Sequence, residues 1–219
     1  MDTAGHDYGV ESSELAAAAA RVDDALGQIV AGAEALGLAD RTTIVVVSDH
    51  GMAALSPDRV VYLEDYVDPE TVDVTEWHGS LAVAPKDGDV SALYRKLHGK
   101  HPALAVYTRE QMPARLHYRN NSRIAPVIGI PRSGWAVSTR ARIERRPLDL
   151  ATHGFDPRDR DMGALFVAAG PGIRRGVVVE PFENVHVYNF LCAVLHLTPA
   201  KNDGGDVVLR RVADDLFAR

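Results

Sequence analysis

An unbroken run of β-branched and apolar residues at positions 42–47 constrains the fold of this chain more than any other segment. A run without polar alternation is typical of a central parallel strand that is covered on both faces. Before it, residues 13–36 place apolar side chains every three or four positions, which predicts one long amphipathic helix that ends at Gly37. This succession predicts an α/β fold with a mostly parallel, doubly wound sheet.

Shorter segments extend the same pattern along the chain. From residue 109 to residue 146 arginines are dense and helical periodicity is lost, so we expect a small inserted subdomain at about residues 85–147. The arginines there are read as a solvated surface with a few structural pairs, in preference to a substrate contact. Apolar runs predict strands at residues 60–66, 81–84, 104–107, 124–130, 135–138 and 163–169, of which the last is expected to be buried, and helices at residues 90–99 and 184–197.

Composition excludes some classes of partner. The net charge of −6 argues against binding to nucleic acid or to an anionic membrane surface through bulk electrostatics. A small phosphorylated substrate stays compatible, because the charge of bound metal ions dominates its own neighbourhood. The single cysteine, Cys192, excludes an internal disulfide and is expected to be a buried apolar side chain. No apolar run reaches the ~20 residues of a membrane span.

Three short motifs carry the ligand types of a hydrolytic zinc centre. They contain Asp2 and His6, then Asp49 and His50, and finally His153, each beside a glycine. Each motif alone has an ordinary alternative: a helix-surface pair, turn chemistry, or a core histidine. Gly5 and Gly9 favour a loop around the first motif. Four histidines are expected not to be ligands: His98, His101, His117 and His196. Two others, His78 and His186, are left open.

The second motif lies where an α/β protein places its ligands. Asp49 and His50 follow directly on the predicted strand at residues 42–47. Ligand sites in open α/β sheets gather beyond the carboxyl ends of the strands. The two hydroxyls that flank ligands, Ser48 and Thr152, are not expected to act as nucleophiles, because a residue beside a ligand usually points elsewhere.

In order and spacing, these motifs resemble the C-terminal half of the catalytic domain of nucleotide pyrophosphatase/phosphodiesterases, in the alkaline phosphatase superfamily. The resemblance covers nearly the whole chain and implies a partial alkaline phosphatase-like fold. It is carried by residues 2–6, 48–52, 116–118 with 123–124, 153–156, 166–171 and 184–189.

The resemblance implies a site with two Zn²⁺ ions. Asp2, His6 and His153 would hold one, and Asp49 and His50 the other together with two ligands expected upstream of this sequence. The nucleophile, a threonine or serine hydroxyl, is also expected upstream, so no catalytic residue is assigned within residues 1–219 and the chain alone is expected to be inactive.

The implied activity of the complete protein is hydrolysis of phosphodiester or pyrophosphate bonds in nucleotide-type substrates. Alternatives are a phosphomonoesterase, a phosphonate hydrolase or a sulfatase-like member of the superfamily, and a non-catalytic metal-binding or interaction domain. The complete family member would be periplasmic or extracellular. A sheet that lacks upstream strands is expected to make this chain self-associate.

Overall fold

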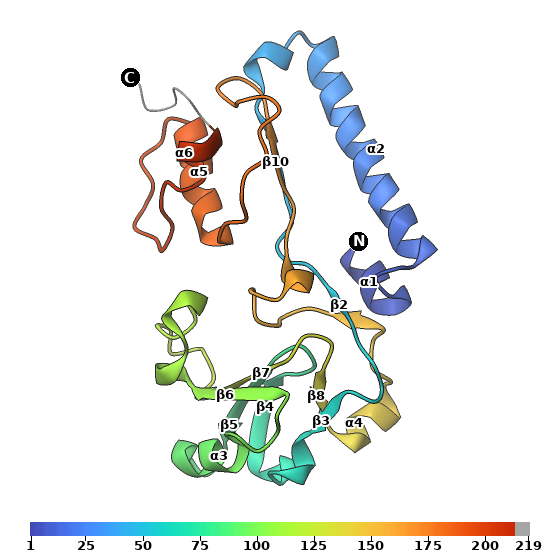
Figure 1. Cartoon of the computed structure of the whole chain (residues 1–219), viewed down its shortest axis with the longest axis vertical. Coiled ribbons are helices and arrows are strands. Elements are labelled where there is room, and N and C mark those ends of the chain that lie inside the picture. The colour runs from blue at the N-terminus through green and yellow to red at the C-terminus, as the bar shows by residue number, and fades with distance from the viewer. Residues whose placement is uncertain (213–219) are drawn as a thin grey trace. The chain divides into compact units, whose positions relative to one another are not determined.

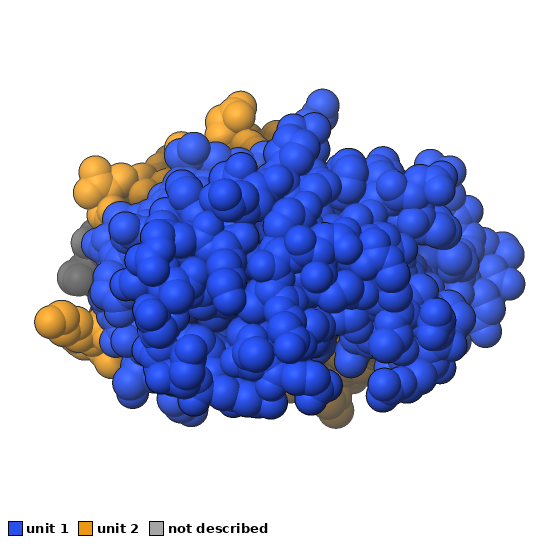
Figure 2. All heavy atoms as spheres, turned by 90° about the horizontal axis from the view of Figure 1, so that it is seen from below, with its two compact units in different colours: residues 1–21, 50–163 blue, residues 22–49, 164–219 orange. Residues whose placement is uncertain are grey.

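A computed structural model describes residues 1–212 of the chain (Figure 1). The chain divides into two compact units, and each is described by itself. Unit 1 comprises residues 1–21 and 50–163, and unit 2 comprises residues 22–49 and 164–219 (Figure 2). All residues of the predicted insert at 85–147 lie in unit 1, and its separate standing as a subdomain stays a prediction.

Unit 1 is built on a four-stranded antiparallel sheet. Its strand order is β4 (Val72–Glu76), β5 (Leu81–Pro85), β7 (Val127–Pro131) and β6 (Leu104–Thr108). Helix α3 (Val90–Leu97) lies against β5 and β6, with Asp89 as its N-cap. Its apolar side chains pack on the central strands, and the resulting core includes Leu81, Val83, Leu93, Leu97 and Val127.

Smaller elements of unit 1 position the candidate site. Strand β3 (Val60–Tyr62) pairs in parallel with β8 (Ala136–Ser138), and β2 (Ala53–Ala54) pairs antiparallel with β9 (Ala151–Thr152). Helix α1 (Asp2–Tyr8) lies against β9, which precedes His153. The packing of α1 against β9 thus brings the first and third sequence motifs together.

Unit 2 holds a two-stranded ribbon beside a short helix. Strand β1 (Ile44–Val47) pairs antiparallel with β10 (Phe166–Ala169). One face of this ribbon packs on α5 (Val187–Val194) and α6 (Leu209–Val212) around Phe190. Residues 22–35 of the long helix α2 (Ser13–Ala35) also belong to this unit, and residues 13–21 belong to unit 1.

The remaining described elements are a helix and several single turns. Helix α4 (Arg140–Arg145) begins after Thr139, whose hydroxyl caps it by accepting a hydrogen bond from the Arg142 N–H. The 3₁₀ turns span Ala39–Arg41, Leu63–Asp65, Pro69–Thr71, Arg109–Gln111, Ala114–Leu116, Arg160–Met162 and Asn184–His186.

Most predicted elements are confirmed, including the long helix, which spans Ser13–Ala35 and is followed by Gly37 at φ 64°. Cys192 is buried, as expected. Among the described residues, no helix is long and apolar enough to cross a membrane. The α/β class is also confirmed, with a mixture of parallel and antiparallel pairs.

The environment predicted for two strands is wrong. Strand β1 was expected to be parallel and covered on both faces, but it pairs antiparallel with β10 and is only partly buried. Strand β10 was expected to be buried, and its residues alternate between half-buried and exposed. A β-branched run specifies an extended backbone, whereas neighbours distant in sequence decide its pairing and burial. Residues 109–146 lack helical periodicity in the sequence, and helix α4 was therefore not predicted.

Candidate metal centre

Helix α1 carries the first two candidate ligands. Asp2 and His6 are four residues apart on this helix, so they occupy the same face one turn apart. The loop predicted for this motif is therefore wrong. Gly5 is buried inside the helix, where a Cβ would collide with the sulfur of Met52. Its absence of a side chain allows close packing, and Gly9, at φ 88°, is the residue that ends the helix.

Asp2 joins the helix to the third motif. Its Oδ1 lies 3.5 Å from His6 Nε2 and 3.6 Å from His153 Nε2. Two ligands at ~2.1 Å from a tetrahedral zinc ion are ~3.4 Å apart, so these two separations fit a shared ion. The donor set, one carboxylate and two imidazoles, is also one that zinc prefers. The residues present therefore fit the metal that the sequence predicts.

His50 lies directly against His153. The two imidazole rings stack with their centroids 3.6 Å apart and an interplanar angle of 14°. His50 Nδ1 is 2.8 Å from its neighbour's carbonyl, that of Gly51, which leaves Nε2 to face a ligand. One ligand atom from each of Asp2, His50 and His153 lies within 4.8 Å of the others. His50 is thus placed at the same centre, half-buried like His153.

Close backbone packing holds the loops that carry these histidines. The Gly51 N–H donates to the Met162 carbonyl at 3.1 Å, and a Cβ on Gly51 would collide with the Asp161 carbonyl. A Cβ on Gly79 would collide with the carbonyl of His153 in the same way. Glycine is required at both positions because two backbones meet there.

The structure brings four of the five predicted ligands together in unit 1. Asp49 belongs to unit 2, so its pairing with His50 stays a prediction. How the four are shared between ions also stays a prediction, since His6 and His50 both lie beside the Asp2–His153 pair. Ser48 accepts a hydrogen bond from the Leu165 N–H at 2.7 Å, and its exclusion as a nucleophile stays a prediction.

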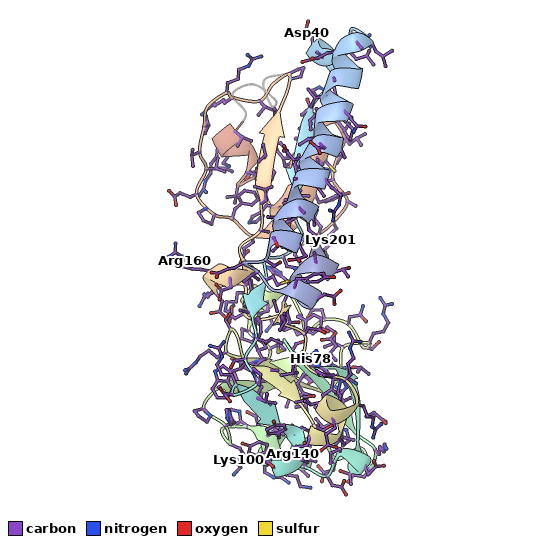
Figure 3. All side chains as sticks on the ribbon, turned by 90° about the vertical axis from the view of Figure 1, so that its right-hand side faces the viewer. Asp40, His78, Lys100, Arg140, Arg160 and Lys201 are labelled. Carbon is purple, nitrogen blue, oxygen red and sulfur yellow. The ribbon has the colours of Figure 1, made fainter. Side chains whose placement is uncertain are left out.

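His78, left open by the sequence, lies near this centre but is not grouped with it. His78, which Figure 3 labels, has a φ of 77°, and its backbone N–H and carbonyl both form hydrogen bonds to Val137 at 3.0 Å. Burial lowers the pKa of its imidazole, while the carboxylate of Asp149 opposes that shift. His186, also left open, accepts a hydrogen bond from the Gly205 N–H in unit 2 and has a structural role.

Sequence reasoning missed an ion pair three residues after His153. Both nitrogens at the end of Arg115 donate to the carboxylate of Asp156, with the Nη1–Oδ1 separation at 2.7 Å. The hydrogen bonds from Arg115 lower the pKa of Asp156. The pair connects the turn Ala114–Leu116 to the loop after β9, on which His153 lies. Asp156 belongs to a motif visible in the sequence, but nothing local in that motif indicates its partner.

Replacing Asp156 by asparagine should destabilise unit 1 by about 1 kcal/mol at pH 7, because both members of the pair are about three-quarters buried. The folded-state pKa of Asp156 is depressed, so its contribution is present above the unfolded pKa of ~3.9 and disappears as pH falls further. Urea unfolding of both proteins at several pH values would test this. A stability difference that stays constant down to pH 3 would contradict the ion-pair explanation.

Comparisons with known proteins agree with the family resemblance of the sequence. The family model described as type I phosphodiesterase / nucleotide pyrophosphatase matches residues 1–156. The chain belongs to this family. Human ectonucleotide pyrophosphatase/phosphodiesterase family member 7 is 33% identical over 209 residues, which are 93% of this chain and 45% of that protein. The mouse bis(5′-adenosyl)-triphosphatase of the family is 33% identical over 204 residues, 93% of this chain and 44% of that protein.

Solved structures of relatives confirm the fold. Human ectonucleotide pyrophosphatase/phosphodiesterase 5 matches with a TM-score of 0.87 at 29% identity, over 97% of this chain and 56% of that chain. An inactive variant of the murine protein in complex with AMP matches with a TM-score of 0.86 at 30% identity, over 96% of this chain and 56% of that chain. The chain spans about half the length of its relatives, and family members are hydrolases.

Proposed function

We propose that the complete protein hydrolyses phosphodiester or pyrophosphate bonds of nucleotide-type substrates with the help of zinc. The observation that carries this proposal is the gathering of candidate ligands around Asp2, whose Oδ1 lies 3.5 Å from His6 Nε2 and 3.6 Å from His153 Nε2, with a ligand atom of His50 within 4.8 Å of those of Asp2 and His153. Membership of the phosphodiesterase family supports the reaction class. The likeness to a relative in complex with AMP supports a nucleotide substrate.

In this proposal the chain's own residues hold and orient two ions. Asp2, His6 and His153 would bind one zinc, and His50 with Asp49 would contribute to the second. When bound, zinc supplies stabilisation of the phosphoryl oxygens and lowers the pKa of an attacking hydroxyl. The backbone contacts of Gly51 and Gly79 fix the loops of His50 and His153, so that little reorganisation is needed when ions bind.

We further propose that residues 1–219 do not turn over substrate by themselves. None of the predicted ligands is a nucleophile, and the hydroxyl of Ser48 is held by the Leu165 N–H. The other hydroxyl beside a ligand, Thr152, is 6% exposed in a β-strand. The chain would then bind zinc and a nucleotide product without cleaving a substrate.

Calorimetric titration with zinc, followed by AMP, tests this proposal. The zinc-loaded chain should bind AMP, and removing zinc with a chelator should abolish that binding, because the phosphate would lose its cationic partner. Inorganic sulfate and a sulfate ester serve as comparisons for the sulfatase-like alternative. A nitrophenyl phosphodiester and a nitrophenyl phosphate should be hydrolysed no faster than by zinc in buffer.

Each result bears on a different part of the proposal. A chain that binds no zinc would contradict a zinc-dependent function. Preference for a sulfate ester over AMP would favour the sulfatase-like alternative. Turnover above the zinc background that His50→Ala abolishes would show that the nucleophile lies within this chain, and would contradict its predicted inactivity.

A further inference from the structure

The second ring nitrogen of His6 faces two acceptors. Its Nδ1 lies 2.8 Å from the carbonyl oxygen of Ala151 and 3.4 Å from Oδ2 of Asp149. A backbone carbonyl only accepts hydrogen bonds, so Nδ1 carries the proton in the neutral ring. The lone pair is then on Nε2, the nitrogen that lies 3.5 Å from Asp2.

The carboxylate of Asp149 is largely buried, and a surface ion pair alone does not explain its position. Its side chain is only 17% exposed, and its second oxygen, Oδ1, lies 3.5 Å from Arg146 Nη2. Arg146 is itself 73% exposed, and an ion pair with so exposed a partner contributes little to stability. The ion pair with Arg146 therefore does not explain why the carboxylate of Asp149 is held next to His6, a candidate ligand.

The backbone keeps this carboxylate close to His6. The Leu150 N–H donates to the His6 carbonyl at 2.8 Å, and Ala151 follows with its bond to the His6 ring. Residues 149–151 are thus attached to one residue of α1 through its main chain and its imidazole. His6 and Ala151 are 145 positions apart in the sequence, so their contact arises from the tertiary fold and not from local structure.

We propose that Asp149 is a positioning residue of the metal centre: its carboxylate, 3.4 Å from His6 Nδ1 and beside the Ala151 carbonyl that accepts the Nδ1 proton, helps to hold the His6 ring with Nε2 directed toward Asp2. This inference rests on the proposed zinc-dependent function. Backbone carbonyls and carboxylates placed against the outer nitrogen of a ligand histidine fix its tautomer and ring orientation and raise its basicity. Loss of such a partner typically weakens metal affinity by about 10–100-fold.

The test compares Asp149→Asn with a matched control. Asparagine keeps the shape of the side chain but removes its charge, so zinc affinity measured by calorimetry should fall by about 10–100-fold. The control, Asp65→Asn, removes the same charge from unit 1 at a carboxylate bound by Arg140, and should bind zinc like the wild type. Arg146→Gln keeps the Asp149 carboxylate and should change zinc affinity by less than about twofold.

A second readout separates positioning from folding. Cobalt(II) bound in place of zinc should give a different visible spectrum in Asp149→Asn, because the ring of His6 is reoriented, while thermal melts in a chelator match the wild type. Asp149→Glu retains a carboxylate and should recover part of the zinc affinity. It also provides the comparison if the asparagine variant does not fold.

The outcomes distinguish this inference from the proposed function. A wild type that binds zinc, together with an Asp149→Asn variant of equal affinity and unchanged cobalt spectrum, would overturn the role of Asp149 alone. A wild type that binds no zinc would overturn the zinc-dependent function as well. A similar loss of affinity in Asp65→Asn would show that net charge, and not the contact with His6, explains the effect.

Discussion

Replacing His153 by alanine should abolish measurable zinc binding by this chain. His153 contacts two other candidate ligands: its Nε2 lies 3.6 Å from Oδ1 of Asp2, and its ring stacks on that of His50. Removing a direct ligand should cost more than the ~10–100-fold that loss of an outer-shell partner costs. Calorimetric zinc titration of the purified variant gives the measurement.

The same measurement on His6→Ala and His50→Ala decides how the ligands are shared. If Asp2, His6 and His153 form the first zinc site, as the family resemblance implies, His6→Ala should weaken the tightest zinc binding more than His50→Ala does. His196→Ala is the control, because His196 is exposed and lies in unit 2. A greater loss in His50→Ala would instead assign the first ion to Asp2, His50 and His153, whose ligand atoms lie within 4.8 Å of one another.

The sequence predicted the parts of this molecule that depend on local pattern. The long helix is confirmed because its apolar spacing and Gly37 act within a few residues of one another. Strands β5 and β6 are confirmed because short apolar runs and flanking turns delimit them. The candidate ligands were recognisable because their chemical types and their order match a family.

Contacts over long sequence separations explain what the sequence did not show. Gly5 was read as a sign of a loop, since its real reason, the close approach of Met52, lies far along the chain. Asp149 carries no local sign of a role, and only the pairing of residues 149–151 with α1 places it beside His6. The β-branched run of β1 was compatible with either direction of pairing, which β10 then decided.

The isolated chain should self-associate through the apolar surface of unit 2. Among the described residues, β1 and β10 pair only with each other, so each has an unpaired outer edge. Val167 is 49% exposed on the face of the ribbon opposite Phe166, and Ile29 on α2 is 63% exposed. Unpaired strand edges beside uncovered apolar side chains favour association between chains. Size-exclusion chromatography with light scattering should show oligomers whose proportion rises with concentration.

Two substitutions with a matched control localise the surface responsible. Val167→Lys places a charge on the exposed ribbon face, where an edge-to-edge or face-to-face contact would bury it, so the oligomers should give way to monomer. Val178→Lys makes the same chemical change at a valine that is 96% exposed, between Val177 and Val179, and lies outside the described strands, so it should leave the oligomers unchanged. A concentration-independent monomer in the wild type would contradict the prediction, since the exposed ribbon would then be tolerated in solution. Equal effects of both lysines would attribute association to net charge, and the unpaired ribbon would not be its cause.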